Sequence, residues 1–325
     1  MDRLTLERRQ VWIYLAAIAG GLVLGTVAPE IGPRFEVLLW SVPAALLYTT
    51  FVQVPLLHVR DAFRDRRFVL AILLGNFVLI PLVLWLALQW LPGDPALRLG
   101  VLLVLLVPCT DWFITFTQLG RGTPAHAIAV TPLNLLAQLL LLPVYLWLML
   151  PVADFSAALK TEEMLPAALA LIGLPLVAAA LSERWVEART GRAIWRERLG
   201  WWPVPLLAVV VFLIAGAQVG TVLDAGPVLL MVLPVFVGFL LVAALLARGL
   251  TRWLRLPMDT GRTLAFSFGT RNSFVVLPFA LALPAGWDTT VVVIVFQSLV
   301  ELFGMVFYLW WLPRHLFREP MKAGA

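Results

Sequence analysis

The chain has 325 residues, of which 62% are hydrophobic and only 13% are charged. Soluble domains carry about 25% charged residues, so the composition excludes a soluble globular protein and indicates an all-α protein that crosses a lipid bilayer several times. The net charge of +5 would suit a nucleic-acid partner, but the positions of the basic residues argue against one. A single cysteine excludes an internal disulfide framework, and three scattered histidines form no metal-binding pattern.

Ten apolar stretches are long enough to cross a bilayer, for which about 20 residues are needed. Short connections separate them, and we expect each stretch to be a transmembrane helix. In chain order they cover residues 11–29, 36–57, 68–91, 96–120, 126–150, 163–182, 201–220, 226–248, 262–284 and 287–312.

The basic residues distinguish the two sides of the membrane. Of the 24 Lys and Arg residues, 20 lie at the termini or in alternate connections. The other connections hold only Arg34, Arg98 and Lys160, and Arg271 lies inside the ninth stretch. Loops rich in Lys and Arg stay in the cytoplasm. We therefore expect a multi-pass protein of the plasma membrane with both termini in the cytoplasm.

Polar residues recur at one offset in the two halves of the chain, residues 1–150 and 151–325. The fifth stretch contains Asn134 and Gln138, and the tenth contains Gln297 and Glu301, each 163 positions after its counterpart. Residues four apart share a helix face, so both helices turn a polar stripe inward. Because five is an odd number, two five-helix repeats would be inserted with opposite topology, as in many secondary transporters. The alternative is coincidence among apolar helices.

The fourth and ninth stretches are interrupted by polar residues. Pro108 removes a backbone hydrogen bond, and Gly269 loosens the ninth helix at the corresponding depth. Backbone groups freed at this depth are tolerated only when they are buried in protein or line a cavity. Paired breaks of this kind point to the binding site of a transporter. We therefore expect two broken, crossing helices, with an ordinary proline kink as the alternative for Pro108.

Three charged residues lie in the middle of membrane-length stretches, where each costs roughly 2.5–3.5 kcal/mol on insertion. Asp111 and Arg271 are expected to form an ion pair across the two breaks, either as a structural brace or as a substrate or proton site. Glu301 has no cationic partner in its own stretch. A buried carboxyl favours its uncharged form and can take up and release a proton. The structural alternative is a hydrogen bond from Glu301 to Asn134 or Gln138.

Cys109 is the only thiol of the chain. It is either a small buried hydrophobe or a soft ligand for a metalloid, and a single thiol can release what it binds. No metal or cofactor site is expected. The candidate substrate-binding residues are Cys109, Thr110, Asn134, Asn272 and Ser273, the candidate ion-pair or coupling residues are Asp111, Gln138, Arg271, Gln297 and Glu301, and the helix breaks are Pro108 and Gly269.

Four short motifs resemble the bile acid/sodium symporter superfamily, and within it the arsenical-resistance efflux permeases. Residues 108–110 resemble the cysteine motif of the permeases, where the cysteine is thought to meet trivalent arsenic. Residues 134–138, followed by Pro143, resemble their asparagine–glutamine helix. Residues 271–274 resemble their Ser-Asn-Asn-Phe motif, and Val300-Glu301 is similar to an Ile-Glu pair in their last span.

The chain departs from both branches of this superfamily. The permeases have small residues and Met after the cysteine, where this chain has residues 111–113, and a Glu where it has Val275. If that Glu carries protons in the permeases, either Glu301 or Asp111 must do so here or the coupling of this chain differs. In the sodium symporters, the resemblance aligns a sodium-binding Glu and Gln with Ser267 and Arg271. A fixed guanidinium at that position argues against sodium coupling.

These observations lead to one functional expectation and two alternatives. We expect a secondary transporter, not an enzyme, that exports arsenite or a related trivalent metalloid in exchange for protons. The first alternative is a sodium- or proton-coupled carrier of small organic anions, with Arg271 holding a carboxylate. The second is a membrane sensor or enzyme, for which the sequence has no appended domain or catalytic set. The expected partners are a small substrate, protons and the bilayer, and the oligomeric state is left open, with a homo-oligomer among the alternatives.

Overall fold

The computed structural model describes residues 3–57, 65–110, 112–151 and 164–318, and within these ranges the chain is helical with no strand. The first half contains α1 (Arg3–Val27), α2 (Gly32–Phe51), α3 (Arg66–Leu74), a π-helical turn η3 (Gly75–Leu79), α4 (Ile80–Ala87), α5 (Pro95–Leu106), α6 (Trp112–Leu119) and α7 (Pro124–Met149). The second contains α9 (Met164–Glu187), α10 (Ala193–Leu199), α11 (Pro203–Ala217), α12 (Val219–Asp224), α13 (Gly226–Trp253), α14 (Met258–Gly269), α15 (Ser273–Leu281) and α16 (Asp288–Trp311).

Side-chain caps fix the starts of three helices. Asp65 accepts hydrogen bonds from the backbone N–H groups of Arg67 and Phe68 at the start of α3. Asp94 accepts from Leu97 N at the start of α5, whose first residue is a proline. Both caps satisfy backbone donors that a helix leaves open at its N-terminus. The third cap, at α15, belongs to the candidate site.

The prediction of a helical, multi-pass membrane protein is confirmed. Five helical segments are long and apolar enough to span a bilayer, namely Arg66–Trp90, Pro124–Met149, Ala193–Ala217, Gly226–Trp253 and Asp288–Leu316. A sixth is counted if the bent pair Trp12–Val27 and Pro29–Phe51 is taken as one span. The predicted fourth and ninth spans fail this test because each is divided: α5 and α14 have 12 residues each, about 18 Å of helix against a bilayer core of about 30 Å.

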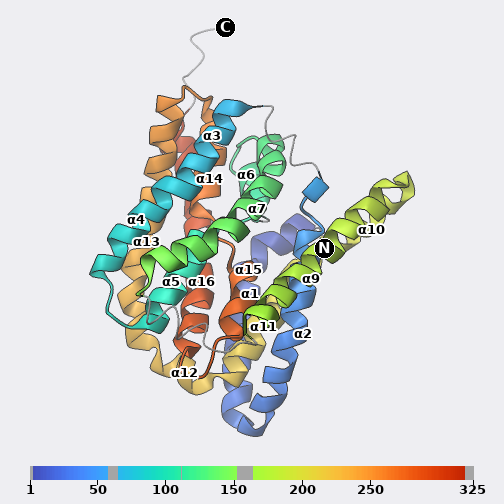
Figure 1. Ribbon diagram of the computed structural model, residues 1–325, viewed down its shortest axis with the longest axis vertical. Helices are drawn as coiled ribbons and strands as arrows, with labels where there is room; N and C mark the ends of the chain where they lie inside the picture. Colours follow the sequence, from blue (N-terminus) through green and yellow to red (C-terminus); the bar gives the residue numbers. More distant parts are fainter. Residues whose placement is uncertain (1–2, 58–64, 111, 152–163, 319–325) are drawn as a thin grey trace.

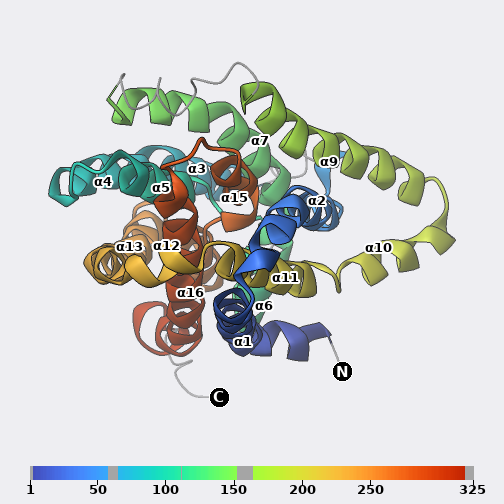
Figure 2. The ribbon, with the colours of Figure 1, turned by 90° about the horizontal axis from the view of Figure 1, so that it is seen from below.

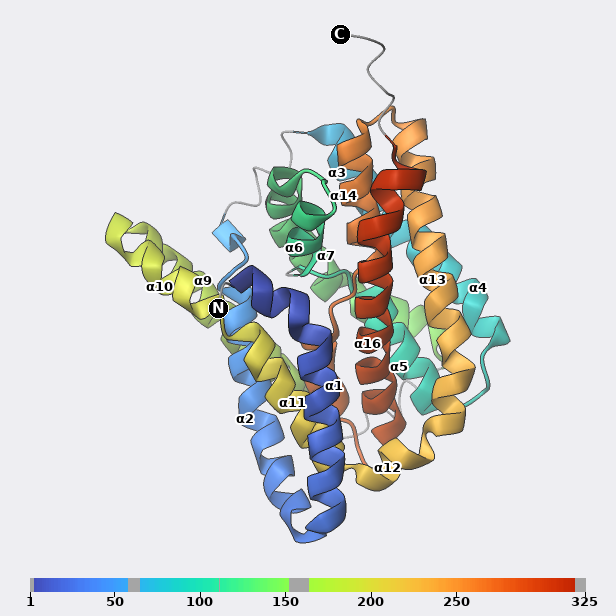
Figure 3. The same ribbon diagram turned by 180° about the vertical axis from the view of Figure 1, so that it is seen from behind.

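The helices form two packing groups, which are separated in Figure 3. One group packs in the order α1, α11, α2 and α9 (Figure 2). The other contains α3 to α7, α13, α14 and α16 (Figure 1). The two groups meet where α15 packs against α2 and α9 on one side and α16 on the other. Each group draws helices from both halves of the sequence, so the packing units do not coincide with residues 1–150 and 151–325.

Candidate functional site

The chain segments that follow α5 and α14 cross each other in the middle of the protein. Cys109 N donates to Thr270 O at 3.1 Å, and Asn272 N donates to Val107 O at 2.8 Å. A shift of 163 positions turns the first of these hydrogen bonds into the second, since 109 becomes 272 and 107 becomes 270. The two halves therefore contribute equivalent backbone groups to an antiparallel contact, and Cys109 lies opposite Asn272.

The two helices end differently at this crossing. α5 ends at Leu106, and Pro108 follows in an isolated antiparallel bridge with Arg271. Gly269 is the last residue of α14. It does not need a left-handed backbone, since Gly286 is the one glycine with positive φ among the described residues. A Cβ on Gly269 would lie 2.8 Å from Tyr308 Cε2, so this glycine permits close packing against α16.

Arg271 is 2% exposed, and its guanidinium is surrounded by oxygen atoms of neutral groups. Nη2 donates to Ser267 O at 2.8 Å, to Phe268 O at 2.6 Å and to Asn76 Oδ1 at 3.0 Å. Nη1 donates to Leu105 O at 3.2 Å. Three separate elements thus supply the acceptors of one fixed cation: α14, η3 and α5. We call these four oxygens the oxygen cage of Arg271.

The predicted ion pair between Asp111 and Arg271 stays a prediction, because Asp111 lies outside the described residues. Within the described part of the chain, the acceptors of the Arg271 guanidinium are carbonyl and amide oxygens. Glu301 approaches the same residue differently, since its Oε2 accepts the backbone N–H of Arg271 at 2.8 Å. The charge of Arg271 is therefore stabilised by neutral dipoles in this part of the structure.

Glu301 lies on α16 and is 1% exposed. Besides Arg271 N, its Oε2 accepts from Gln297 Nε2 at 2.9 Å, and Gln297 Oε1 accepts from Ser273 Oγ at 3.5 Å. Glu301 Oε1 has no hydrogen-bond partner among the described residues. The predicted alternative, a hydrogen bond from Glu301 to Asn134 or Gln138, is not found there.

Three substrate-binding candidates lie at the crossing itself. Cys109 and Thr110 are 2% and 1% exposed. Asn272 Nδ2 donates to Thr110 Oγ1 at 3.2 Å, and Asn272 Oδ1 accepts from Val275 N at 3.3 Å. One asparagine side chain therefore caps α15 and joins it to the opposite broken helix. The hydrogen bond between Asn272 and Thr110 thus involves the residue that follows Cys109 in the chain.

Asn134 and Gln138 lie one turn apart on the buried face of α7, and their side chains are 0% and 2% exposed. Neither amide has a hydrogen-bond partner within the part of the chain that the structure describes. α7 packs against α5, α6 and α14, and α16 packs against α5, α13, α15 and α14. The polar residues therefore form two pairs, one on each of two helices. We call Asn134 and Gln138 the first-half pair, and Gln297 and Glu301 the second-half pair.

Asn76 was missed by sequence reasoning, and Ser267 was not predicted to accept a hydrogen bond from Arg271. Asn76 accepts from Arg271 and donates from Nδ2 to Ser267 Oγ at 3.0 Å, so Asn76 and Ser267 hold the cation in place. Asn76 belongs to the π-helical turn η3, and π turns are frequent at functional sites. The available signal was a lone amide after Gly75 in the middle of an apolar stretch.

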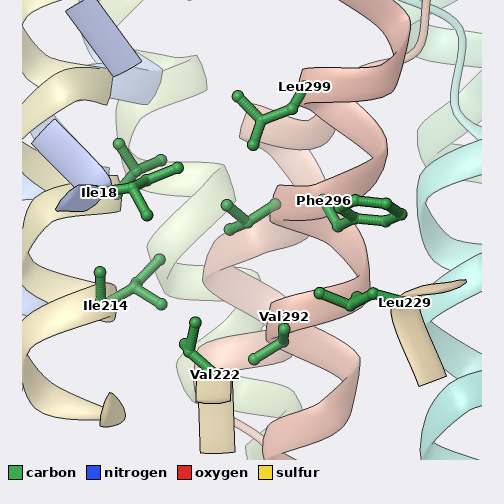
Figure 4. Close-up of a pocket in the computed structure, with 10 residues that line it drawn as sticks. Ile18, Ile214, Val222, Leu229, Val292, Phe296 and Leu299 are labelled. Atoms are coloured by element: carbon green, nitrogen blue, oxygen red, sulfur yellow. The ribbon is translucent and has the colours of Figure 1, made fainter. Parts of the chain in front are cut away.

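A separate cavity of about 120 Å³ lies between the two packing groups. Figure 4 shows its side chains, which come from α1, α11, α12, α13 and α16 and include Ile18, Ile214 and Phe296. All ten lining residues are apolar, and none is a predicted site residue. The cavity therefore marks a weakly packed contact between the groups and not the polar site. Among the described residues, no group of three or more His, Cys, Asp and Glu side chains could hold a metal ion.

Comparison with known proteins identifies the family. A sequence model described as "Sodium Bile acid symporter family" matches residues 44–225, which is 182 of the 325 residues. The match includes the Cys109 crossing segment and the first-half pair. No curated protein matches the chain. Symporters are transport proteins and not enzymes, as expected from the sequence. Because the match covers more than half of its length, the chain belongs to the sodium bile acid symporter family.

Proposed function

We propose that this protein is a secondary transporter that exports arsenite, or a related trivalent metalloid, from the cytoplasm across the plasma membrane in exchange for protons. The observation that carries the proposal is the position of Cys109. This only thiol of the chain is buried at the crossing of the broken helices, beside the hydrogen bond between Thr110 and Asn272. Thiol sulfur is a soft ligand that prefers soft metals and metalloids.

The proposal includes ten spans in two inverted five-helix repeats. Each of the ten predicted stretches overlaps a helix of the structure. The two backbone hydrogen bonds of the crossing exchange under the same offset of 163 that relates the two polar pairs. This exchange supports a two-fold relation between the halves. The distribution of basic residues then supports cytoplasmic termini.

Glu301 is the proposed proton carrier. Its Oε2 accepts from two donors, its Oε1 has no partner among the described residues, and the residue as a whole is 1% exposed. A buried carboxyl can change its protonation state when its surroundings change. Proton entry down an inside-negative potential contributes about 2.3 kcal/mol per charge per 100 mV, which suffices to drive export against a gradient.

The oxygen cage of Arg271 supports coupling that does not use sodium at this position. Backbone and amide oxygens are the ligands that a hard cation needs. Here the guanidinium already takes four of them at 2.6–3.2 Å. Because the cation is covalently part of the chain, it cannot be exchanged with the solution.

The two packing groups are the proposed moving units. They meet at α15 and at an apolar cavity of about 120 Å³. The cavity lining is apolar, and the hydrogen bond from Gln218 Nε2 to Asp288 Oδ1 is exposed and long at 3.4 Å. The groups can therefore rock past each other while the crossing stays within one of them. Such rocking would expose the crossing to the two sides of the membrane in turn.

A carrier of small organic anions is the second candidate, and the family description favours it. In this reading Arg271 would hold the carboxylate of the substrate. Four of the hydrogen bonds that its guanidinium donates already go to the oxygen cage, so a carboxylate would have to displace protein acceptors. The metalloid proposal requires no such exchange.

The test is arsenite resistance of a sensitive strain that expresses the protein, the Cys109→Ser variant or the Asp111→Ala variant. We expect resistance with the wild type and its loss in both variants at equal protein levels in the membrane. Resistance that persists in both variants would contradict the proposal that Cys109 binds the substrate. Sodium-dependent uptake of labelled organic acids by proteoliposomes, without arsenite transport, would establish the second candidate.

A further inference from the structure

The first-half and second-half pairs differ in their hydrogen bonding. In the second-half pair, both polar atoms of the Gln297 amide and Oε2 of Glu301 have partners. In the first-half pair, none of the four amide atoms of Asn134 and Gln138 has a partner in the described ranges of the chain. An unpaired buried polar group costs about 1–3 kcal/mol, so each such group in a native structure calls for an explanation.

Two differences in sequence explain why the first-half pair stays open. The second-half pair is closed by the backbone N–H of Arg271. The residue 163 positions earlier is Pro108, which has no N–H to donate. Asn134 is also one methylene shorter than its counterpart Gln297, so it reaches less far toward the residue one turn away. The open pair is therefore encoded in the sequence.

The open pair lies on the side of α7 that faces the broken helices. α7 packs against α5, α6 and α14, which lead into and out of the crossing. Its outward residues Leu136 and Leu140 are 41% and 74% exposed, whereas Asn134 and Gln138 are buried. The four unpartnered amide atoms thus lie on the buried side of α7, and two of the helices packed against it, α5 and α6, flank the segment that contains Cys109 and Thr110.

The chemistry of two amides selects the class of ligand. Each amide has an acceptor oxygen and a donor NH2 group. A bare cation would satisfy only the oxygens, and a carboxylate would satisfy only the NH2 groups. An uncharged molecule with several hydroxyl groups both donates and accepts, so it can satisfy all four atoms.

We infer that Asn134 and Gln138 bind the transported substrate in an uncharged, hydroxyl-bearing form, while Gln297 and Glu301 keep their hydrogen bonds within the protein. The inference rests on the proposed function in treating the crossing as a transport site. It deepens that proposal because arsenous acid, which is neutral near pH 7 and carries hydroxyl groups, belongs to this class. The two pairs then have different roles: the first-half pair binds the substrate, and the second-half pair carries the proton.

The experiment uses the purified full-length protein in a potassium buffer at neutral pH. Thermal unfolding is measured with arsenous acid and boric acid as uncharged hydroxyl probes, sodium chloride as a cation probe and taurocholate as an anion probe. The variants are the double change Asn134→Leu/Gln138→Leu and the single change Pro108→Ala, which supplies the missing N–H. Thr131→Val is the matched control, since it removes a buried hydroxyl one turn earlier on α7 that bonds only Ala127 O.

We expect the hydroxyl probes to raise the unfolding temperature of the wild type and of Thr131→Val but not of the Leu double variant. Without probe, the double variant should unfold at or above the wild-type temperature, because it loses no protein hydrogen bond. Pro108→Ala should weaken probe binding roughly threefold to tenfold, the value of one neutral hydrogen bond. Arsenite transport in everted vesicles should fall in parallel.

Each outcome separates this inference from the proposed function. If arsenite is not transported but boric acid still stabilises the wild type through the pair, the proposed substrate fails and the ligand class stands. The inference is overturned if the double variant unfolds well below the wild type without probe, since the amides would then be structural. It is equally overturned if only sodium or taurocholate acts through the pair, or if no probe does.

Discussion

The polar pair of the second half is closed by protein donors, whereas the pair of the first half has none within the described residues. Each pair lies on one face of its own long helix, α7 or α16, and its two residues are four positions apart. The two pairs are 163 positions from each other in the sequence. The difference comes from what each half contributes to the crossing: Arg271 brings a backbone donor and a fixed cation, and Pro108 brings neither. Two polar pairs related by one offset can thus differ in their hydrogen bonding when a few residues at the crossing differ.

The largest expected loss of stability follows from removing the buried cation of the second half, Arg271. Arg271→Ala removes four hydrogen bonds to buried oxygens, and hydrogen bonds to charged groups contribute about 1.5–3 kcal/mol each. We expect a loss of stability of more than about 3 kcal/mol, measured by thermal or chemical unfolding in detergent. The mirrored change Pro108→Ala should be neutral or stabilising. If Arg271→Ala and Pro108→Ala lower stability equally, the two residues do not contribute differently to the crossing.

Gly269→Ala is expected to cause the second-largest loss of stability. The added methyl would lie 2.8 Å from Tyr308 Cε2 and 2.9 Å from Met305 Cε, so α14 and α16 would have to separate or repack. Overpacking of this kind costs typically about 1–3 kcal/mol. The position 163 residues earlier is Leu106, and Leu106→Ala should instead lose apolar burial. Unfolding measurements on both variants test whether Gly269 is needed for the close packing of α14 against α16. If Gly269→Ala does not lower stability, this close packing does not require a glycine.

Asn272→Ala should cost about 1–2 kcal/mol. The change removes the cap of α15 and the bond to Thr110; a helix cap contributes about 1 kcal/mol, as does a neutral hydrogen bond. Its mirror is Cys109→Ala, for which we expect a smaller loss of stability but the loss of arsenite resistance. If Cys109→Ala leaves resistance intact, the thiol has no place in the transport site.

The smallest effect on stability is expected for Glu301→Gln, at less than about 1 kcal/mol, because an amide oxygen can still accept from Arg271 N and Gln297. Its effect on coupling should be large, since an amide does not take up or release a proton near neutral pH. Arsenite transport in everted vesicles should lose its response to an imposed pH gradient. A response equal to that of the wild type would assign proton transfer to another residue, with Asp111 as the first to examine.

Several features of the site were accessible from the sequence for simple reasons. Pro108 cannot donate a backbone hydrogen bond, so an interruption there follows from covalent chemistry. The shared offset predicts that Cys109 lies opposite Asn272, and the structure has these two residues in equivalent hydrogen bonds. The role of Gly269 was anticipated less well, because close packing against Tyr308 depends on α16, which is distant in sequence.

Composition, the spacing of apolar stretches and the distribution of basic residues determined that this protein is helical and membrane-embedded, because hydrocarbon accepts only backbone whose hydrogen bonds are satisfied within the protein. Tertiary structure alone decided which oxygens surround Arg271, that Glu301 bonds Gln297 and not Asn134, and that only the second-half pair is closed. The bond from Arg271 to Asn76 joins segments 195 residues apart, and the bond from Arg271 N to Glu301 joins segments 30 residues apart. Sequence periodicity describes one helix at a time, so it cannot report which donor of one helix meets which acceptor of another.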